Sequence, residues 1–286
     1  MLTKVYIAAG LGLAALVAGV PARAEDNSTS VGFPQSWFDM ATRTQDMQPH
    51  WMTPVVTVTP RLEQEVRYDQ FDEALPHGKT LMNYDGGKGL ELITSEATEL
   101  IIGVPPYQTR SAPKPVNGFA DDPVFLLKYR LLSANEQQGN YILTAFFQLS
   151  APTGATVFTN NAYILQPTIA FGKGWGLFDI QSTVSQQYSI ATNPAGHAFG
   201  DPILVNVAAQ FHISNILWPE LEANYTYFLN GARNDQSQLF FTPGIIFGRF
   251  PIYERVKVNI GVGYQIAVTD KAAFNHNLIL TTRLTF

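Results

Sequence analysis

The 286-residue sequence contains no cysteine, which excludes disulfides, thiolate catalysis and cysteine-ligated metal. Charged residues make up only 14% of the chain, and 23 acidic residues outnumber 18 lysines and arginines. This balance does not favour nucleic acid as a partner, because nucleic acids bind to basic surfaces. Beyond the N-terminal segment, no apolar run reaches the roughly 18 residues that a transmembrane helix needs. Hydrophobic residues nevertheless amount to 46%, so they are spread over many short segments.

The N-terminus has the pattern of a secretory signal peptide. Lys4 precedes a small and apolar run from Val5 to Val20, and Pro21–Ala24 supplies an A-x-A cleavage site. We therefore predict a signal peptide over residues 1–24 and export of the mature chain. Residues 25–50 form a separate segment, which we expect to be a periplasmic tail or a lumen plug with a short helical stretch.

The C-terminal stretch from His276 to Phe286 alternates between apolar and polar residues. Leu278, Leu280, Leu284 and Phe286 fall at even spacings along the sequence. A period of two residues places them on one face of a strand, which gives the strand one apolar side. A strand that ends on a terminal aromatic residue is typical of the closing strand of an outer-membrane barrel. We predict that Leu284 and Phe286 form the signal that barrel-assembly machinery recognises.

Strand patterns recur from residue 51 to the end, and they predict an antiparallel transmembrane β-barrel over residues 51–286. Many of these strands, at about 9 to 14 residues, exceed the five or six that are usual in soluble sheets. A β-sandwich also alternates, but its apolar face meets a second sheet. We predict twelve strands: Pro54–Asp69, Thr80–Ile93, Thr98–Pro105, Val124–Leu132, Tyr141–Ser150, Ala162–Phe171, Leu177–Ile190, Ile203–Ile213, Leu221–Leu229, Gln238–Phe247, Val256–Thr269 and His276–Phe286.

Short connections alternate with longer ones that are rich in Pro, Gly, Asn and Asp. This is the pattern of short periplasmic turns and long outer loops. An even number of strands places both termini on the periplasmic side. We expect the last strand to pair antiparallel with the first, Pro54–Asp69, so that Arg283 enters the lumen beside Arg61 to Arg67.

Charged residues on the polar faces of the strands are the candidates for lining the lumen. They could form a charged constriction that selects solutes. They could also pair with one another and fill a lumen of intermediate width, because eight strands are filled by side chains and sixteen hold open water. The candidates are Arg61, Glu63, Glu65, Arg67, Lys128, Arg130, Glu220, Glu222, Lys257 and Arg283.

The segment His212-Ile213-Ser214-Asn215 resembles the local motif of outer-membrane phospholipases and deacylases, in which a His activates a Ser. Ile216 stands where a Gly or Ala is expected. The pair is also predicted to face the lumen beside a periplasmic turn, whereas lipid substrates lie on the outer side. A turn that begins Ser-Asn accounts for the residues without catalysis. We therefore predict no enzyme activity, and neither a metal site nor another cofactor.

Several segments together resemble one family of outer-membrane barrels, the "MetA-pathway of phenol degradation" family of outer-membrane transporters. The segments are GGKGLELI (86–93), FLLKYRLLSANEQQGNYILTAF (125–146), FGKGW (171–175), WPE (218–220), GRFP (248–251), QIAVT (265–269) and NHNLIL (275–280). The resemblance spans nearly the whole mature chain. It implies passage of hydrophobic or aromatic compounds across the outer membrane, and it assigns no binding residues.

We therefore expect a channel in the outer membrane of a Gram-negative-type bacterium, surrounded by lipid, that passes small solutes, among them hydrophobic or aromatic ones, passively. A lipid-acting barrel enzyme that uses His212 and Ser214 is one alternative. A closed barrel with a structural or binding role is another. The sequence leaves the identity of the solute, the state of the lumen and the oligomeric state open.

Overall fold

The computed structural model describes residues 32–86 and 88–286 of the chain. The predicted signal peptide lies outside the described residues, as does the start of the 25–50 segment. One helix, α1 (Gln35–Asp46), precedes the strands. Within the described part, no helix is long and apolar enough to cross a membrane.

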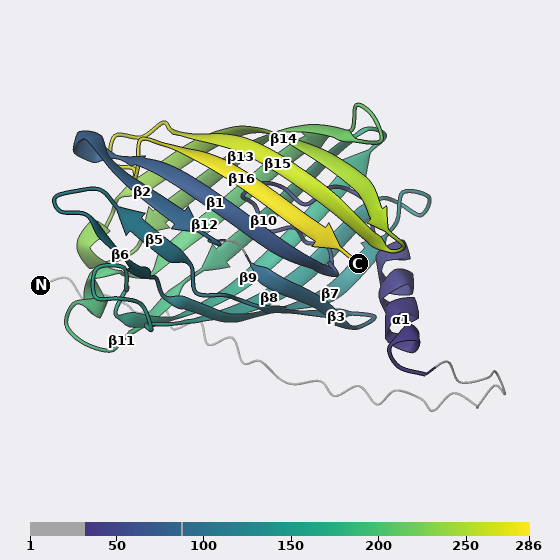
Figure 1. Cartoon of the computed structure of the whole chain (residues 1–286), viewed down its shortest axis with the longest axis horizontal. Helices are drawn as coiled ribbons and strands as arrows, with labels where there is room; N and C mark the ends of the chain where they lie inside the picture. The colour runs from purple at the N-terminus through teal and green to yellow at the C-terminus, as the bar shows by residue number, and fades with distance from the viewer. Residues whose placement is uncertain (1–31, 87) are drawn as a thin grey trace, which may run out of the picture.

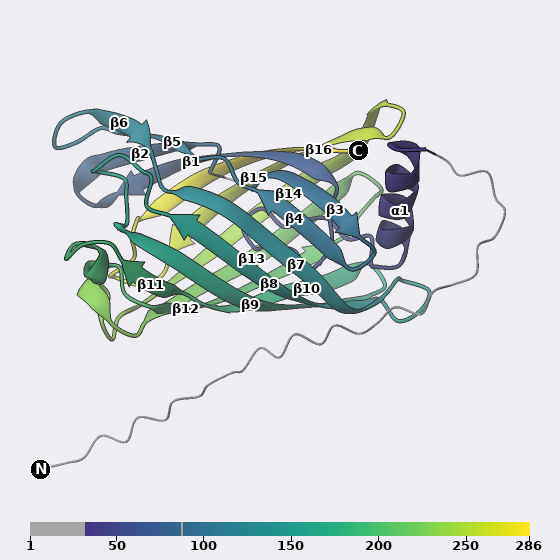
Figure 2. The ribbon, with the colours of Figure 1, turned by 90° about the horizontal axis from the view of Figure 1, so that it is seen from below.

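Twelve strands form a closed antiparallel barrel, which confirms the predicted fold (Figures 1 and 2). Closure occurs between the first and last strands, which pair from Glu65 with Thr285 to Ala74 with His276, as predicted for the C-terminal strand. The wall strands are β1 (Glu65–Leu75), β3 (Gly89–Ser95), β4 (Thr98–Ile102), β7 (Asp122–Ala134), β8 (Tyr141–Ala151), β9 (Ala162–Trp175), β10 (Phe178–Gln186), β12 (Pro202–Phe211), β13 (Leu217–Phe228), β14 (Ser237–Tyr253), β15 (Val256–Ala267) and β16 (His276–Thr285).

Four short strands extend the wall at one end. β2 (Lys79–Tyr84) forms a hairpin with β1, β5 (Tyr107–Arg110) and β6 (Val116–Phe119) continue outward from β2, and β11 (Tyr188–Ala191) pairs with β9. We call this the loop end, because the long connections lie there. The β5–β6 hairpin lies in a region that the sequence predicted to be loop.

The apolar face of each strand points outward. On β16, Leu278, Leu280 and Leu284 are each about 40% exposed, whereas Ile279 and Arg283 are buried. A β-sandwich would bury the apolar face, so this arrangement excludes it. An outward apolar face with a polar interior is typical of transmembrane barrels.

The predicted first strand, Pro54–Asp69, is wrong over its first eleven residues, because β1 begins only at Glu65. Residues Trp51–Gln64 instead cross the interior of the barrel, and all of them are buried except Val56 and Val58, which are half-buried. We call this segment the plug. Pro54 and Pro60 lack an N–H group, which disfavours a central strand at this position.

Helix α1 lies across the end of the barrel at which the C-terminus is found, which we call the helix end (Figure 1). The Trp37 indole donates to the carbonyl oxygen of Ile93 at 2.7 Å, and the Asn135 amide donates to that of Asp46 at 3.0 Å. The turns at this end are the short ones, so α1 packs close to the rim. The predicted helical stretch within residues 25–50 is therefore observed.

The ladder of backbone hydrogen bonds is interrupted between the β2–β5 and β3–β4 pairings. Tyr84 pairs with Tyr107, and Leu90 pairs with Ile102, but no pairing joins the two segments between these pairs. Gly86 and Gly89 keep backbone contacts with β1. We call this interruption the wall break. The break divides the predicted second strand, Thr80–Ile93, into β2 and β3 beside Gly86, and a glycine weakens a strand interior.

Candidate functional site

The plug occupies the lumen through hydrogen bonds between its backbone and side chains of the wall. Acidic residues of β13 accept from three consecutive plug amides. One Glu220 oxygen accepts from the Val55 N–H at 2.9 Å, and the two Glu222 oxygens accept from Val56 at 2.7 Å and Thr57 at 2.6 Å. A carboxylate that accepts from backbone amides makes strong, charge-assisted hydrogen bonds.

Basic residues of the wall hold the plug carbonyls in the same way. Arg283 donates to the carbonyl oxygens of Thr53 and, at 2.6 Å, of Pro54. Arg67 donates to Val55 at 2.7 Å. Lys128 donates to the carbonyl oxygen of Arg61 at 2.9 Å. The wall thus supplies several plug backbone groups with partners of the opposite polarity.

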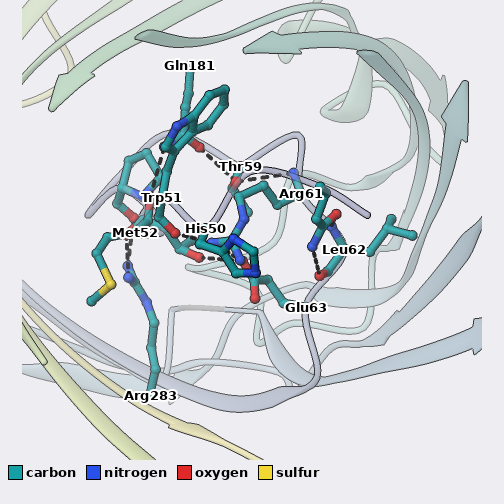
Figure 3. Close-up of polar contacts among 12 residues, drawn as sticks. His50, Trp51, Met52, Thr59, Arg61, Leu62, Glu63, Gln181 and Arg283 are labelled. Carbon is teal, nitrogen blue, oxygen red and sulfur yellow. Dashed lines mark hydrogen bonds and ion pairs between the residues drawn. The ribbon is translucent and has the colours of Figure 1, made fainter. Parts of the chain in front are cut away.

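Amide side chains complete this arrangement (Figure 3). The Gln181 side chain accepts from the Thr59 hydroxyl at 2.7 Å and donates to the carbonyl oxygen of Met52 at 2.9 Å. The Gln48 side chain bonds both the N–H and the carbonyl oxygen of Leu62. A buried backbone group without a partner is costly, so these bonds take the place of a β-ladder.

Apolar contacts fill the remaining space on the helix side of the lumen. Trp51, Met52 and Val55 of the plug pack against Ile142, Trp218, Ile246 and Ile279 of the wall. These contacts close the space between this part of the plug and the wall.

Buried ion pairs lie around the plug and neutralise several of the charges. Arg61 pairs with Glu63 at 2.9 Å within the plug, and Arg67 pairs with Asp69 at 2.8 Å. Lys128 pairs with Glu99 at 3.0 Å. Glu99 was not a predicted lumen residue, because β4 is too short to give a clear alternating pattern.

The sequence-derived charged residues are therefore distributed over three locations. Arg61 and Glu63 belong to the plug and not to a wall strand, which corrects the position predicted for them. Lys257 is exposed near the helix end, where it borders a polar cavity of about 360 Å³. The other candidates project inward from the wall: Glu65, Arg67, Lys128, Arg130, Glu220, Glu222 and Arg283.

A second cavity, of about 300 Å³, lies between the plug and the wall break. The plug contributes Val55, Val56 and Val58 to its lining, and residues beside the break contribute Lys88 and Pro106. Further lining residues are Arg67, Asp69, Phe71, Gly86, Asp121, Pro123 and Gln148. The cavity therefore combines an apolar surface with a few charged groups, as small-molecule sites commonly do.

The junction between α1 and the plug is attached to the β7–β8 turn. The Glu136 carboxylate accepts from the backbone N–H of His50 at 2.6 Å and lies 2.9 Å from Nδ1 of the same residue. Partial burial tends to raise the pKa of this carboxyl, but the His50 hydrogen bonds outweigh it and lower the pKa to about 2. The carboxylate is thus ionised over the ordinary pH range and anchors the junction.

His212 and Ser214 show no arrangement for nucleophilic catalysis. The His212 ring stacks on Trp218, with ring centroids 3.9 Å apart. The Ser214 hydroxyl oxygen accepts from the Ile216 N–H at 3.4 Å. Across residues 32–86 and 88–286, no hydrogen bond joins His212 to Ser214, and no three His, Asp or Glu side chains gather as a metal site.

No family model matches the sequence, and no curated protein matches it. The structure is similar to the crystal structure of the COG4313 outer membrane channel from Pseudomonas putida F1, with a TM-score of 0.51 and 16% identity over 78% of this chain and 94% of that one. A structure of the NanC porin gives a TM-score of 0.46 and 6% identity over 77% and 98% of the two chains. The similarity to the Pseudomonas protein shows that this chain shares the barrel fold of an outer-membrane channel.

Proposed function

We propose that the protein is an outer-membrane channel for passive passage of small hydrophobic or aromatic solutes. The solute enters the lumen from the loop end and leaves sideways at the wall break, above the plug. The family resemblance found in the sequence also implies this class of solute. Nothing in the described part of the chain couples passage to an energy source.

The observation that carries this proposal is the position of the 300 Å³ cavity. It lies between the plug and the wall break, where the β2–β5 and β3–β4 pairings do not meet. Half of its lining is aliphatic, aromatic or proline: Val55, Val56, Val58, Phe71, Pro106 and Pro123. An apolar solute gains free energy by leaving water for such a surface.

The plug explains why the route is lateral. A hydrophilic solute must pass the plug to reach the helix end, and many buried hydrogen bonds hold the plug in place. A hydrophobic solute needs only to move from the cavity into the adjacent bilayer, where it is also stable. The arrangement therefore favours hydrophobic over hydrophilic cargo.

Filling the cavity tests the proposal. Val56→Phe adds volume at the half-buried plug position that lines the cavity. Val66→Phe makes the same change on the outer face of β1, where the side chain is 43% exposed, and serves as the control. The measurement is the initial rate at which intact Gram-negative cells take up radiolabelled naphthalene, with the protein or an empty vector.

We expect the wild-type protein and Val66→Phe to raise the uptake rate several-fold over the vector, and Val56→Phe to lower it toward the vector rate. Equal amounts of folded protein in the outer membrane are confirmed by heat-modifiable migration on gels. Uptake at the vector rate by the wild-type protein, together with no conductance in planar bilayers, would instead indicate a closed structural barrel.

A further inference from the structure

We infer that the cavity between the plug and the wall break contains a binding site for the carboxylate of a small amphipathic solute, with Arg67 and Lys88 as its hydrogen-bond donors. This inference rests on the proposed function, because it specifies a class of solute for the same cavity. It adds a charged head group to the hydrophobic solutes considered above.

Arg67 is oriented by bonds that leave one of its donor groups unused. Its Nε donates to both oxygens of Asp69, at 3.0 and 2.8 Å, and its Nη2 donates to the Val55 carbonyl oxygen. Its Nη1 is buried and has no hydrogen-bond partner within the described chain. Arg67 lines the cavity, so a fixed guanidinium with a free donor borders this space.

Lys88 borders the same cavity from the wall break. Its Nζ is buried, forms no ion pair within 4.0 Å of a described carboxylate, and has no hydrogen-bond partner among the described residues. An ammonium in this situation is costly unless a partner of opposite charge reaches it. Two cationic residues, each with an unused buried donor, therefore border one cavity.

The carboxylates that border the cavity are already engaged. Asp69 is held by Arg67 in a buried ion pair. The Asp121 oxygens accept from the backbone amides of Gly154 at 3.1 Å and Asn160 at 2.6 Å. Glu91 does not line the cavity, and its carboxylate lies 4.0 Å from the Lys128 Nζ. Glu91 is also an opposite charge near Lys88, but no hydrogen bond joins the two side chains.

The rest of the lining suits the apolar part of an amphipathic molecule. The valines of the plug, with Phe71, offer a surface for one ring or a short chain. A carboxylate bonded to Arg67 and Lys88 would satisfy both donors, and charge-assisted hydrogen bonds of this kind are strong. A neutral molecule of the same shape would leave both donors unpaired.

Two probes of equal size separate this inference from simple hydrophobic binding. Benzoate and benzamide differ in charge but hardly in shape. Their affinities for the purified, folded full-length protein in non-ionic detergent at pH 7 are measured by equilibrium dialysis. The variants are Lys88→Met, Lys88→Arg, which keeps the charge, and Lys114→Met, a matched change at an exposed lysine outside the cavity.

We expect the wild-type protein to prefer benzoate. Lys88→Met should weaken benzoate binding about tenfold or more and leave benzamide binding within about twofold. Lys88→Arg and Lys114→Met should keep the preference. Equal affinities for the two probes, no binding of either, or an unchanged preference in Lys88→Met would overturn the inference. Naphthalene uptake tests the proposed function separately, because that probe carries no head group.

Discussion

Arg283 and Pro54 are 229 positions apart in the sequence, yet the Arg283 guanidinium donates to the Pro54 carbonyl oxygen at 2.6 Å. The last strand thus holds the segment that precedes the first strand. Glu220 and Glu222 of β13, three strands along the wall from β16, hold the following residues. The inward charges therefore act on the plug backbone, a role that neither sequence-based interpretation of the lumen anticipated.

Replacing Glu222 with Gln should loosen the plug. The amide can accept from only one of the Val56 and Thr57 N–H groups and presents a donor to the other. Removing a buried charge-assisted bond costs about 1.5–3 kcal/mol, which corresponds to a tenfold or greater rise in the frequency of opening. Single-channel recording in planar bilayers measures this frequency. Asp270→Asn, at an exposed loop position, should leave it unchanged, and equal recordings for both variants would contradict the role of Glu222.

A disulfide between the plug and the wall should lock the lumen. A Cβ placed on Gly263 lies 3.6 Å from the Val55 Cβ, within the separation of about 3.5–4.5 Å found in disulfides. The sequence contains no other cysteine to compete. In Val55→Cys/Gly263→Cys, we expect oxidation to abolish opening events and reduction to restore them. Naphthalene uptake should be the same in both states.

The single variants Val55→Cys and Gly263→Cys control for the substitutions themselves. The opposing outcome is that oxidation lowers uptake in the double variant and in neither single variant. That result would show that the plug must move for the solute to pass, and the lateral route would then be wrong.

Acid should loosen the junction between α1 and the plug. The pKa of Glu136 is lowered to about 2, below its ordinary value of 4.5, so the carboxylate stabilises the folded junction above pH 4.5. This contribution is lost as the pH falls from about 4.5 toward 2. Solvent screens the partly exposed pair, so the effect is modest. We expect a change in tryptophan fluorescence over this range, because Trp51 follows His50 directly.

Glu136→Gln cannot ionise and should lack this transition. A transition of the same size in the variant would assign the acid response to other carboxylates.

Shortening the C-terminus should impair assembly. Leu284 lies on the outer face of the closing strand, and the Phe286 N–H donates to the Gln64 carbonyl oxygen at 3.0 Å, where the plug meets β1. We expect removal of Phe286 to lower the amount of folded protein in the outer membrane several-fold while export continues. The control is Leu278→Ala, because Leu278 lies on the same face of β16 as Leu284 and is equally exposed, at 39%. Normal assembly without Phe286 would refute the proposed signal.

The closing strand could be predicted because its environment differs between its two faces. Leu280 meets the outside and Arg283 meets the lumen, so an alternating sequence is required. The same alternation at Val56 to Glu63 does not mark a wall strand, because an extended segment inside a barrel also places successive side chains on opposite sides. Both of its sides meet wall residues, and only Pro54 and Pro60 distinguish it from a wall strand.

Lys88 could not be recognised from the sequence as a binding residue. It follows Gly86-Gly87 at the break in a strand, where the alternation of faces stops. Its importance depends on the absence of a hydrogen-bond partner for its Nζ and on the plug valines that border the same cavity. Both properties arise from segments that are distant in sequence, so local patterns do not contain them.

The plug continues directly into β1 at Gln64 and Glu65, and β1 is one of the two strands that close the barrel. A barrel that closed first would have to admit the plug afterwards through its end, past the rim that α1 covers. Seating the plug and closing the wall are therefore parts of one folding step. The buried bonds from Arg283 to the plug can form only when β16 pairs with β1, so β16 completes the wall and fixes the plug at the same time.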